Sequence, residues 1–338
     1  MNAMLDPAIL FFVFGVLAGF VRSNLEIPSA ISRFLSLYLL MALGLKGGFA
    51  LAHSGLTLEV AKSMCVAITL ALMVPLVGYQ LLRRWVGGFD AAAVAATYGS
   101  ISAVTFVTAV QHLENLGIAF GGHMAASMAL MESPAIIMAV VIVNHLRQTA
   151  TRGSVLAQSN GSAVLSGASL GAGPCMSWGK VLHESFTDGA QLLLLGSMVV
   201  GLISGDTGKA AMQPFSGDLF KGMLAFFLLD MGLMASRNMA QLKGKSPVLM
   251  AYAVLGPVCH AALALALSWW LGLSAGDGAL LMVLAASASY IAVPAVLRDA
   301  VPEANPSLYF GLSLGVTFPI NILLGVSVYT QIAQWVLG

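Results

Sequence analysis

The chain has 338 residues, of which 59% are hydrophobic and 9% charged, and its mean hydropathy is +0.90. Soluble domains carry about 25% charged residues, so this composition excludes a water-exposed globular protein and indicates an integral membrane protein. The near balance of 15 Lys and Arg against 14 Asp and Glu gives no sign of nucleic-acid binding, and three scattered cysteines exclude a disulfide framework or a metal site.

Ten apolar segments are candidates for transmembrane helices, which need roughly 20 mainly apolar residues. Their runs are continuous and rich in Leu, Ala and Met, which favours helices over the alternating pattern of a membrane β-barrel. In chain order, the predicted spans are Pro7–Val21, Ser29–Leu45, Val60–Trp85, Phe89–Leu113, Gly122–Leu146, Gly189–Gly205, Asp218–Ala235, Pro247–Gly272, Gly276–Leu297 and Pro306–Leu337. We therefore predict an all-α integral membrane protein.

Basic residues predict which way these spans run. Ten crossings place both termini on one side, and most Lys and Arg residues fall in the loops that follow odd-numbered spans. These residues are Arg22, Arg83, Arg84, Arg147, Arg152, Lys180, Arg237, Lys243, Lys245 and Arg298. The opposite side carries Lys46, Lys62 and Lys209, with Lys221 near the start of span seven. Positive loops stay in the cytoplasm, so we predict a multi-pass protein of the inner (plasma) membrane with both termini outward.

A polar segment divides the ten spans into two sets of five. Residues 148–188 include "SNGSAVLSGASLGAGP", which is the composition of a flexible linker. We predict a first five-helix repeat over residues 1–147, a cytoplasmic linker over 148–188 and a second five-helix repeat over 189–338.

The two sets share features in the same order, which indicates an internal repeat. The matched pairs are Arg33 with Lys221, Gly44 with Gly232, Pro75 with Pro257, Ser100 with Ser287, Ser102 with Ser289 and Pro134 with Pro319. Because five is odd, the second copy must enter the membrane in the opposite sense. Inverted repeats of this kind are typical of transporters, whose site lies at the midplane between the two halves.

Two polar stretches interrupt apolar spans: "YGSIS" in span four and "SASYIAVP" in span nine. Glycine and serine disfavour a continuous helix, Pro294 lacks an N–H, and irregular backbone in lipid is tolerated only beside protein or a wet cavity. We predict two broken helices whose second halves begin after Ser102 and Ser289. Their N–H groups carry partial positive charge and would form an anion site.

Side-chain hydroxyls near the two interruptions would add donors to that anion site. These belong to Ser100, Ser102, Thr105, Ser287, Ser289 and Tyr290. The alternative is that small residues and serines here only let neighbouring helices pack closely.

Oxygen ligands for a cation lie in the spans that follow the interruptions. Glu132 in "MESPAI" is an ionisable residue deep in an apolar segment, and Thr317 and Asn321 occupy the related "GVTFPIN". Such hard ligands suit Na⁺. The alternative for Glu132 is a protonated or paired carboxyl that joins helices, and for Asp230 in span seven pairing and transport roles stay open. Packing roles are expected for the histidines His112, His123, His145 and His260.

Assembled, these segments resemble the sodium-dependent bicarbonate transporter family known from cyanobacteria. The likeness runs from "IPSAISRFLSLYLLMALGLKGGFAL" through "YGSISAVTFVTAVQHLE", "MALMESPAIIMAVVIVN" and "FFLLDMGLMA" to "SASYIAVPAVLRDAVPEANPSLYFGLSLGVTFPINI". It covers nearly the whole chain except the linker, and "SASYIAVPA" with "GVTFPIN" is its most specific part.

The resemblance implies a ten-helix 5+5 inverted repeat with two broken helices, a core domain and a gate domain. It also implies a homotrimer that moves bicarbonate by an elevator-like excursion, with Na⁺ as the coupling ion and no other cofactor. The anion would be held by Gly99, Ser100, Ile101, Ser102, Ala103, Thr105, Ser287, Ala288, Ser289, Tyr290 and Ile291. The implied sodium ligands are Glu132, Ser102, Thr317 and Asn321. A PII-like regulatory protein on the cytoplasmic side is a further partner that the family suggests.

The chain departs from the family pattern at two positions. Glu132 stands where an aspartate is expected, and Ala42 stands where a lysine is expected, with Lys46 one turn later. These departures bear on the roles of individual residues and on coupling.

Bicarbonate uptake driven by sodium symport is the function that the resemblance implies, whereas the two interruptions by themselves indicate only a small anion. A transporter of another small anion, such as a monocarboxylate or sulfate, or one coupled to protons through Glu132, stays open, and a channel is less consistent with the repeat. An intramembrane enzyme is the reading from a different class, but no histidine stands close in sequence to either serine cluster. We therefore expect that the protein is not an enzyme.

Overall fold

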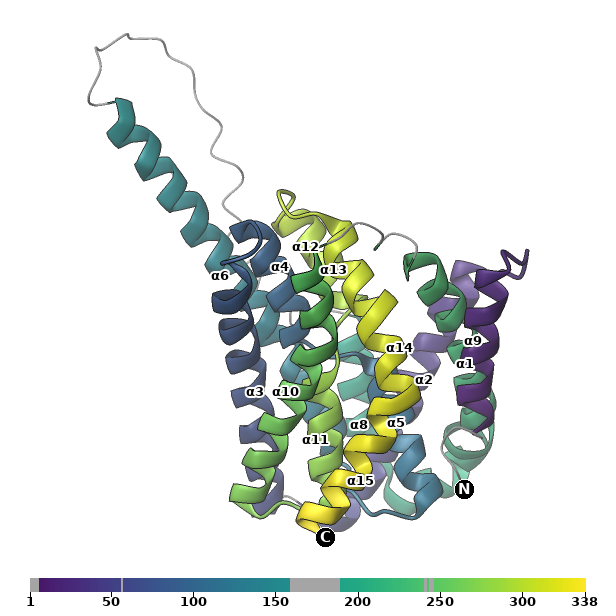
Figure 1. The fold of residues 1–338 in the computed structure, drawn as a ribbon. Helices are drawn as coiled ribbons and strands as arrows, with labels where there is room; N and C mark the ends of the chain where they lie inside the picture. Colours follow the sequence, from purple (N-terminus) through teal and green to yellow (C-terminus); the bar gives the residue numbers. More distant parts are fainter. Residues whose placement is uncertain (1–5, 56, 159–188, 240–241, 243–245) are drawn as a thin grey trace.

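The computed structural model describes residues 6–55, 57–158, 189–239, 242 and 246–338, and every long regular element in these ranges is a helix (Figure 1). In chain order the elements are α1 (Pro7–Phe20), α2 (Ser29–Ser54), α3 (Leu58–Leu82), α4 (Gly88–Gly99), α5 (Ala103–Leu116), α6 (Met124–Gln158), α8 (Gly189–Gln213), η2 (Pro214–Asp218), α9 (Leu219–Met239), α10 (Pro247–Leu271), α11 (Ala275–Ala286), α12 (Ala292–Ala300), α13 (Pro306–Leu312), η4 (Ser313–Thr317), α14 (Phe318–Ile320), η5 (Asn321–Gly325) and α15 (Val326–Leu337).

Seven helical stretches within the described ranges are long and apolar enough to cross a membrane. One of them, Gly189–Met239, contains both the sixth and the seventh predicted spans. The shorter apolar helix α1 corresponds to predicted span one, and the shorter apolar helix α11 corresponds to the first half of predicted span nine. Large hydrophobic side chains are exposed along the outer faces of these helices, for example Phe14 on α1, Val77 on α3 and Leu255 on α10. Exposed apolar surface of this extent fits a lipid environment.

The helix α8 changes direction at Gly205, whose backbone has φ 53° and ψ −141°. Glycine adopts this left-handed region without the steric penalty of a Cβ. The sixth predicted span ends at this residue. Beyond it the chain continues as helix to Gln213 and reaches α9 through the π-helical turn η2.

Two pairs of short helices occupy the fourth and ninth predicted spans. α4 ends at Gly99 and α5 begins at Ala103, and α11 ends at Ala286 and α12 begins at Ala292. At the first of these ends the backbone lies against α3. A Cβ on Gly99 would lie 2.6 Å from the Pro75 ring, so only glycine fits this approach.

The helices divide into two groups by their contacts. α1 packs along α9 and α2 packs along α8, and we call these helices with η2 the smaller group. The larger group contains α3 to α6 and α10 to α15, with α3 against α4 and α6, and α11 against α10 and α15. Close approach in the smaller group depends on Gly15 and Gly232, because a Cβ on either would lie 2.3 Å from a carbonyl oxygen of the facing helix.

The predicted linker falls partly within a helix. α6 extends to Gln158, so the first residues of the 148–188 segment are helical, whereas residues 159–188 lie outside the described part of the chain. α1 begins and α15 ends at the same end of the molecule, and α6 reaches its last residues at the opposite end (Figure 1).

Candidate functional site

The two interruptions lie against each other in the interior. The backbone N–H of Ser102 donates to the Ser287 hydroxyl at 3.0 Å, and the backbone N–H of Ser289 donates to the Thr97 carbonyl at 2.8 Å. All four residues are buried. Residues nearly 190 positions apart in the sequence therefore share one hydrogen-bonded crossing.

Matched serines each accept a backbone N–H from the helix that follows them, although α12 begins at Ala292, two residues later than predicted, and only α5 begins directly after its serine. The Ser102 hydroxyl oxygen is the N-cap acceptor of α5, receiving the Thr105 N–H at 3.3 Å and the Thr105 hydroxyl at 3.0 Å. The Ser289 hydroxyl oxygen receives the Val293 N–H of α12 at 3.2 Å. These bonds use each hydroxyl oxygen as an acceptor at the start of a helix.

The first backbone N–H groups of α5 and α12 stay available. The first turn of a helix has no intrahelical acceptors for its N–H groups, and Ser102 satisfies only that of Thr105. The N–H groups of Ala103, Val104 and Ala292 lie in these first turns, and all three residues line the same cavity.

This cavity has a volume of about 190 Å³, and we call it the site cavity. Seven of the predicted site residues line it: Ile101, Ser102, Ala103, Glu132, Ser289, Tyr290 and Ile291. A water molecule occupies about 30 Å³ in the liquid, so the volume suits a small ion with part of its hydration. The other predicted anion residues do not line the site cavity; these are Gly99, Ser100, Thr105, Ser287 and Ala288, which lie buried around the crossing.

Glu132 enters the site cavity from α6 and is joined there by Gln191 from α8. The Gln191 amide donates to Glu132 Oε2 at 2.9 Å, and both side chains line the cavity. Sequence reasoning did not identify Gln191. The available signal was an amide within "GAQLLLLG", a polar residue in an otherwise apolar span.

Thr317 and Asn321 lie beside the site cavity rather than in its lining. The Thr317 hydroxyl donates to the Ala253 carbonyl at 2.8 Å and lies 2.7 Å from the Tyr98 hydroxyl. The Asn321 amide donates to the Ala286 carbonyl at 2.7 Å, which satisfies the last residue of α11. Both therefore support the interruptions through the π-helical turns around Pro319.

The remaining singled-out residues hold helices together outside the site cavity. Asp230 on α9 accepts a hydrogen bond from the Ser32 hydroxyl of α2, which is the pairing role. His123 lies 3.6 Å from Asp277, whose other oxygen accepts the Gly121 N–H. Ala42 is fully buried. The ammonium of Lys46 forms an ion pair with Glu114, at 3.0 Å, and does not pair with Glu132.

The site cavity thus brings together hydroxyl groups at two helix starts, a carboxylate and an amide. Hydroxyl protons and helix N–H groups face it from α5 and α12, and a carboxylate and an amide face it from α6 and α8. Within the described residues, no lysine or arginine lines it. Neither ion would therefore meet a fixed positive side-chain charge.

Comparison with known protein families identifies the family of the chain. The family model of the Na⁺-dependent bicarbonate transporter superfamily matches residues 7–334. No curated protein matches the chain. Because this is a family of transporters, the protein is a sodium-dependent bicarbonate transporter of the multi-pass membrane type and not an enzyme. The chain belongs to the Na⁺-dependent bicarbonate transporter superfamily.

Proposed function

We propose that the protein takes up bicarbonate by sodium symport, with the anion at the starts of α5 and α12 and sodium beside Glu132. The observation that carries this proposal is that Ser102, Ser289 and Glu132, from three predicted spans, line one cavity of about 190 Å³. The family supplies the identity of the two ions.

The anion would be held by neutral donors. The oxygens of Ser102 and Ser289 each accept a helix N–H, so their hydroxyl protons would be the groups that donate to the anion. Backbone N–H groups at a helix start add partial positive charge without a cationic side chain. A neutral donor set binds an anion weakly beside an ionised Glu132, so the site needs a second ion.

Sodium meets that need. The Glu132 carboxylate and the carbonyl oxygen of the Gln191 amide are hard oxygen ligands of the kind that Na⁺ prefers. Two opposite unit charges about 4 Å apart attract by about 4 kcal/mol at an effective dielectric constant of 20. Each ion therefore stabilises the other, and the two should bind together.

Joint binding also solves the energetic problem of uptake. Moving one negative charge into a negative-inside cell costs about 2.3 kcal/mol per 100 mV. One Na⁺ per bicarbonate cancels this electrical term, and the sodium gradient then drives accumulation. Because this symport moves no net charge, we expect an imposed membrane potential to leave the rate of bicarbonate uptake unchanged.

Alternating access would come from movement between the two helix groups. We propose that the smaller group is the gate domain and the larger group the core domain of a ten-crossing inverted repeat. The pairing of α1 with α9 and α2 with α8 supports this, because an exchange of repeat halves maps one pair onto the other. The site cavity takes residues from both groups, so an elevator-like displacement of the larger group would move the ions past the smaller one.

The orientation of the chain completes the proposal. Basic residues such as Arg22, Arg83 and Arg147 follow odd-numbered spans, which supports an inner-membrane protein with both termini outward. The homotrimer and the PII-like regulator stay predictions from the family resemblance.

Uptake of labelled bicarbonate into proteoliposomes tests the symport. We expect accumulation with an inward sodium gradient, little with potassium in its place, and no replacement of sodium by a proton gradient. Glu132→Gln should remove most sodium stimulation, whereas Glu303→Gln, a carboxylate outside the site cavity, should behave as wild type. Equal uptake with and without sodium would overturn the proposal.

A further inference from the structure

A second cavity of about 500 Å³ lies between the same two helix groups. The smaller group lines it from the last turns of α2 and from the segment that joins α8 to α9, and the larger group lines it from α5 and the start of α6. We call it the outer cavity, because it lies toward the end of the molecule where α1 begins (Figure 1).

The outer cavity carries a positive charge that the site cavity lacks. Lys46, Lys209 and Lys221 line it together with Glu114 and Asp218, which leaves one excess positive charge. Lys46 and Glu114 neutralise each other at 3.0 Å. Lys221 donates to the amide oxygen of Asn115 at 3.1 Å and so keeps its charge. Lys209 is exposed and forms neither a hydrogen bond nor an ion pair with the residues that the structure describes.

Only about one helical turn separates the two cavities. On α2, Leu40 lines the site cavity and Leu43 lines the outer cavity, and on α6 the corresponding residues are Met128 and Met124. Three or four residues of helix span about 5 Å. On α5, Val104 lines the site cavity and Phe106 lines the outer cavity.

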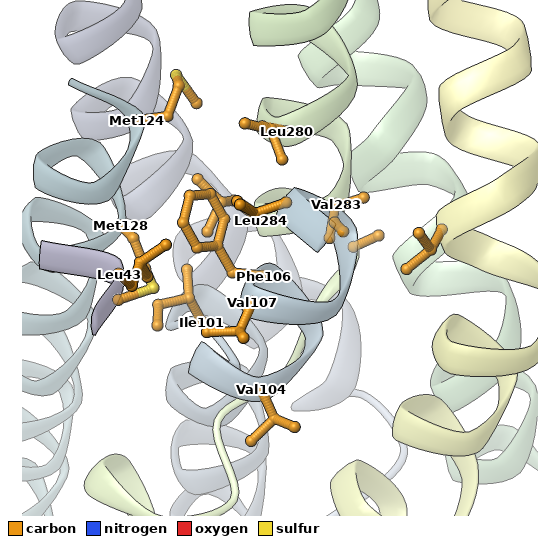
Figure 2. Packing of buried hydrophobic residues seen from close by; sticks show 14 of the residues in the cluster. Leu43, Ile101, Val104, Phe106, Val107, Met124, Met128, Leu280, Val283 and Leu284 are labelled. Atoms are coloured by element: carbon orange, nitrogen blue, oxygen red, sulfur yellow. The ribbon is translucent and has the colours of Figure 1, made fainter. Parts of the chain in front are cut away.

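The material between the cavities is apolar. Leu43, Ile101, Phe106 and Met128 are buried members of one hydrophobic cluster, and Figure 2 shows them gathered at one place between α2, α5 and α6. An apolar layer of this kind blocks the passage of ions because a charge loses its hydration there. Displacement of one helix group past the other would separate these contacts.

We propose that the outer cavity is the vestibule through which a small anion reaches the site cavity, and that Lys209 and Lys221 attract the anion into it. The inference rests on the proposed bicarbonate symport for the identity of the cargo. An excess of positive charge in a cleft raises the local concentration and the arrival rate of an anion. A lysine or arginine in the site cavity would bind the anion tightly and slow its release. Positive charge in the vestibule attracts the anion without this effect.

Reactivity of a thiol placed in the outer cavity tests its charge without any transport measurement. Gln213→Cys lies one turn from Lys209 on the same face of α8, in a background of Cys65→Ala, Cys175→Ser and Cys259→Ala. The measured quantity is the rate ratio of an anionic to a cationic methanethiosulfonate on detergent-purified protein. The ratio cancels any change in the pKa of the thiol itself.

We expect this ratio to be roughly tenfold higher at Gln213→Cys than at Gln331→Cys, an exposed glutamine on α15 that lines neither cavity. Adding Lys209→Gln, or about 0.5 M salt, should remove most of the difference. Equal ratios at the two positions, or a ratio that does not respond to Lys209→Gln, would overturn the proposal.

Transport measurements then test the role of the lysines. Lys209→Gln with Lys221→Gln should raise the half-saturation concentration for bicarbonate about three- to tenfold and preserve the maximal rate. Lys62→Gln is the matched control, because its ammonium bonds the Leu271 carbonyl and lines neither cavity. If wild type transports bicarbonate and the double variant has unchanged half-saturation, the vestibule role is wrong. If wild type shows no sodium-stimulated uptake, the symport proposal fails while the reactivity ratio still decides the charge of the vestibule.

Discussion

The two interruptions have matched sequences but unequal environments. At the second, the Ser287 hydroxyl is fully used, since it accepts from the Ser102 N–H and donates to the Leu284 carbonyl. At the first, its counterpart Ser100 is buried and its hydroxyl has no partner among the described residues. Ile291 of the second interruption is 54% exposed, whereas Ser100, Ile101 and Ser102 of the first are buried.

Residues at matched positions of the two interruptions therefore have different structural roles. The second interruption contributes the Ser287 hydroxyl and the Ser289 N–H to the two hydrogen bonds of the crossing, and its Ile291 is exposed at the edge of the site cavity. The first interruption supplies a buried wall with a well-capped helix start. Only the pair Ser102 and Ser289 keeps the same role on both sides.

Removing either of these two hydroxyls should have the largest effect. Hydrogen bonds to a charged group contribute about 1.5–3 kcal/mol, so Ser102→Ala and Ser289→Ala should each raise the half-saturation concentration for bicarbonate roughly 10- to 100-fold. Uptake into proteoliposomes measures this, and Ser102→Thr should retain most of the affinity. Ser313→Ala is the control, since that buried hydroxyl bonds the Tyr309 carbonyl outside the site cavity. Unchanged half-saturation in both alanine variants would move the anion elsewhere.

Gly99→Ala should destabilise the protein, because the first interruption packs too closely against Pro75 to accept a Cβ at this position. A Cβ at Gly99 would lie 2.6–2.7 Å from three ring atoms of Pro75, and overpacking of this kind costs about 1–3 kcal/mol. The matched position is Ala286, which already carries a Cβ. Thermal unfolding of the purified protein measures the loss, and the loss should shrink in a Pro75→Ala background. A Gly99→Ala protein as stable as wild type would remove the reason given for the end of α4.

Ser287→Ala should lower the stability of the protein more than Ser100→Ala does, although the two serines occupy matched positions in the sequence. The first variant leaves the buried Ser102 N–H without an acceptor, which costs about 1–2 kcal/mol. The second removes a hydroxyl that has no partner in the described part of the chain, so stability should stay near wild type. Equal losses in thermal unfolding would show that the two positions are equivalent after all.

The smallest effect concerns the ends of the helices that follow the interruptions. Beyond α12, Arg147 pairs with Glu303 at 2.8 Å and donates to the Ala300 carbonyl, and this hydrogen bonding lowers the pKa of Glu303. A lowered carboxyl pKa adds stability above the unfolded pKa of about 4.3, and that stability is lost as pH falls through the folded pKa. Since Glu303 is partly exposed, we expect less than about 1 kcal/mol.

Comparing thermal unfolding of wild type and Glu303→Gln at neutral pH and near pH 3 measures this contribution. Wild type should be slightly more stable at neutral pH, and the two proteins should converge in acid. A difference that grew as the pH fell would contradict the assignment.

Sequence reasoning reached the helical class and the family, because each leaves a local pattern. Continuous apolar runs predict membrane helices, and Gly99, Ser100 and Ser287 disfavour helix where α4 and α11 end. The assignment of each helix pair to one interrupted membrane span belongs to the proposal. Seven predicted site residues line one cavity, six of them around the starts of α5 and α12 and the seventh, Glu132, on α6.

Other features depended on contacts between distant segments. Gln191 pairs with Glu132 across 59 positions, and no spacing rule connects an amide in one apolar span with a carboxylate in another. The outer cavity likewise brings Lys46, Lys209 and Lys221 together only through the packing of α2, α8 and α9 in the smaller group. Thr317 and Asn321 could be singled out by type, but only their bonds to Ala253 and Ala286 show that they support the crossing.

The most direct test of the central claim is a high-resolution density map of the protein prepared in sodium bicarbonate. The account predicts a small planar density within hydrogen-bonding distance of the Ser102 and Ser289 hydroxyls, and a second density coordinated by Glu132. It also predicts that both densities vanish when potassium replaces sodium. A bicarbonate density elsewhere, or one that persists between the serines without sodium, would contradict it.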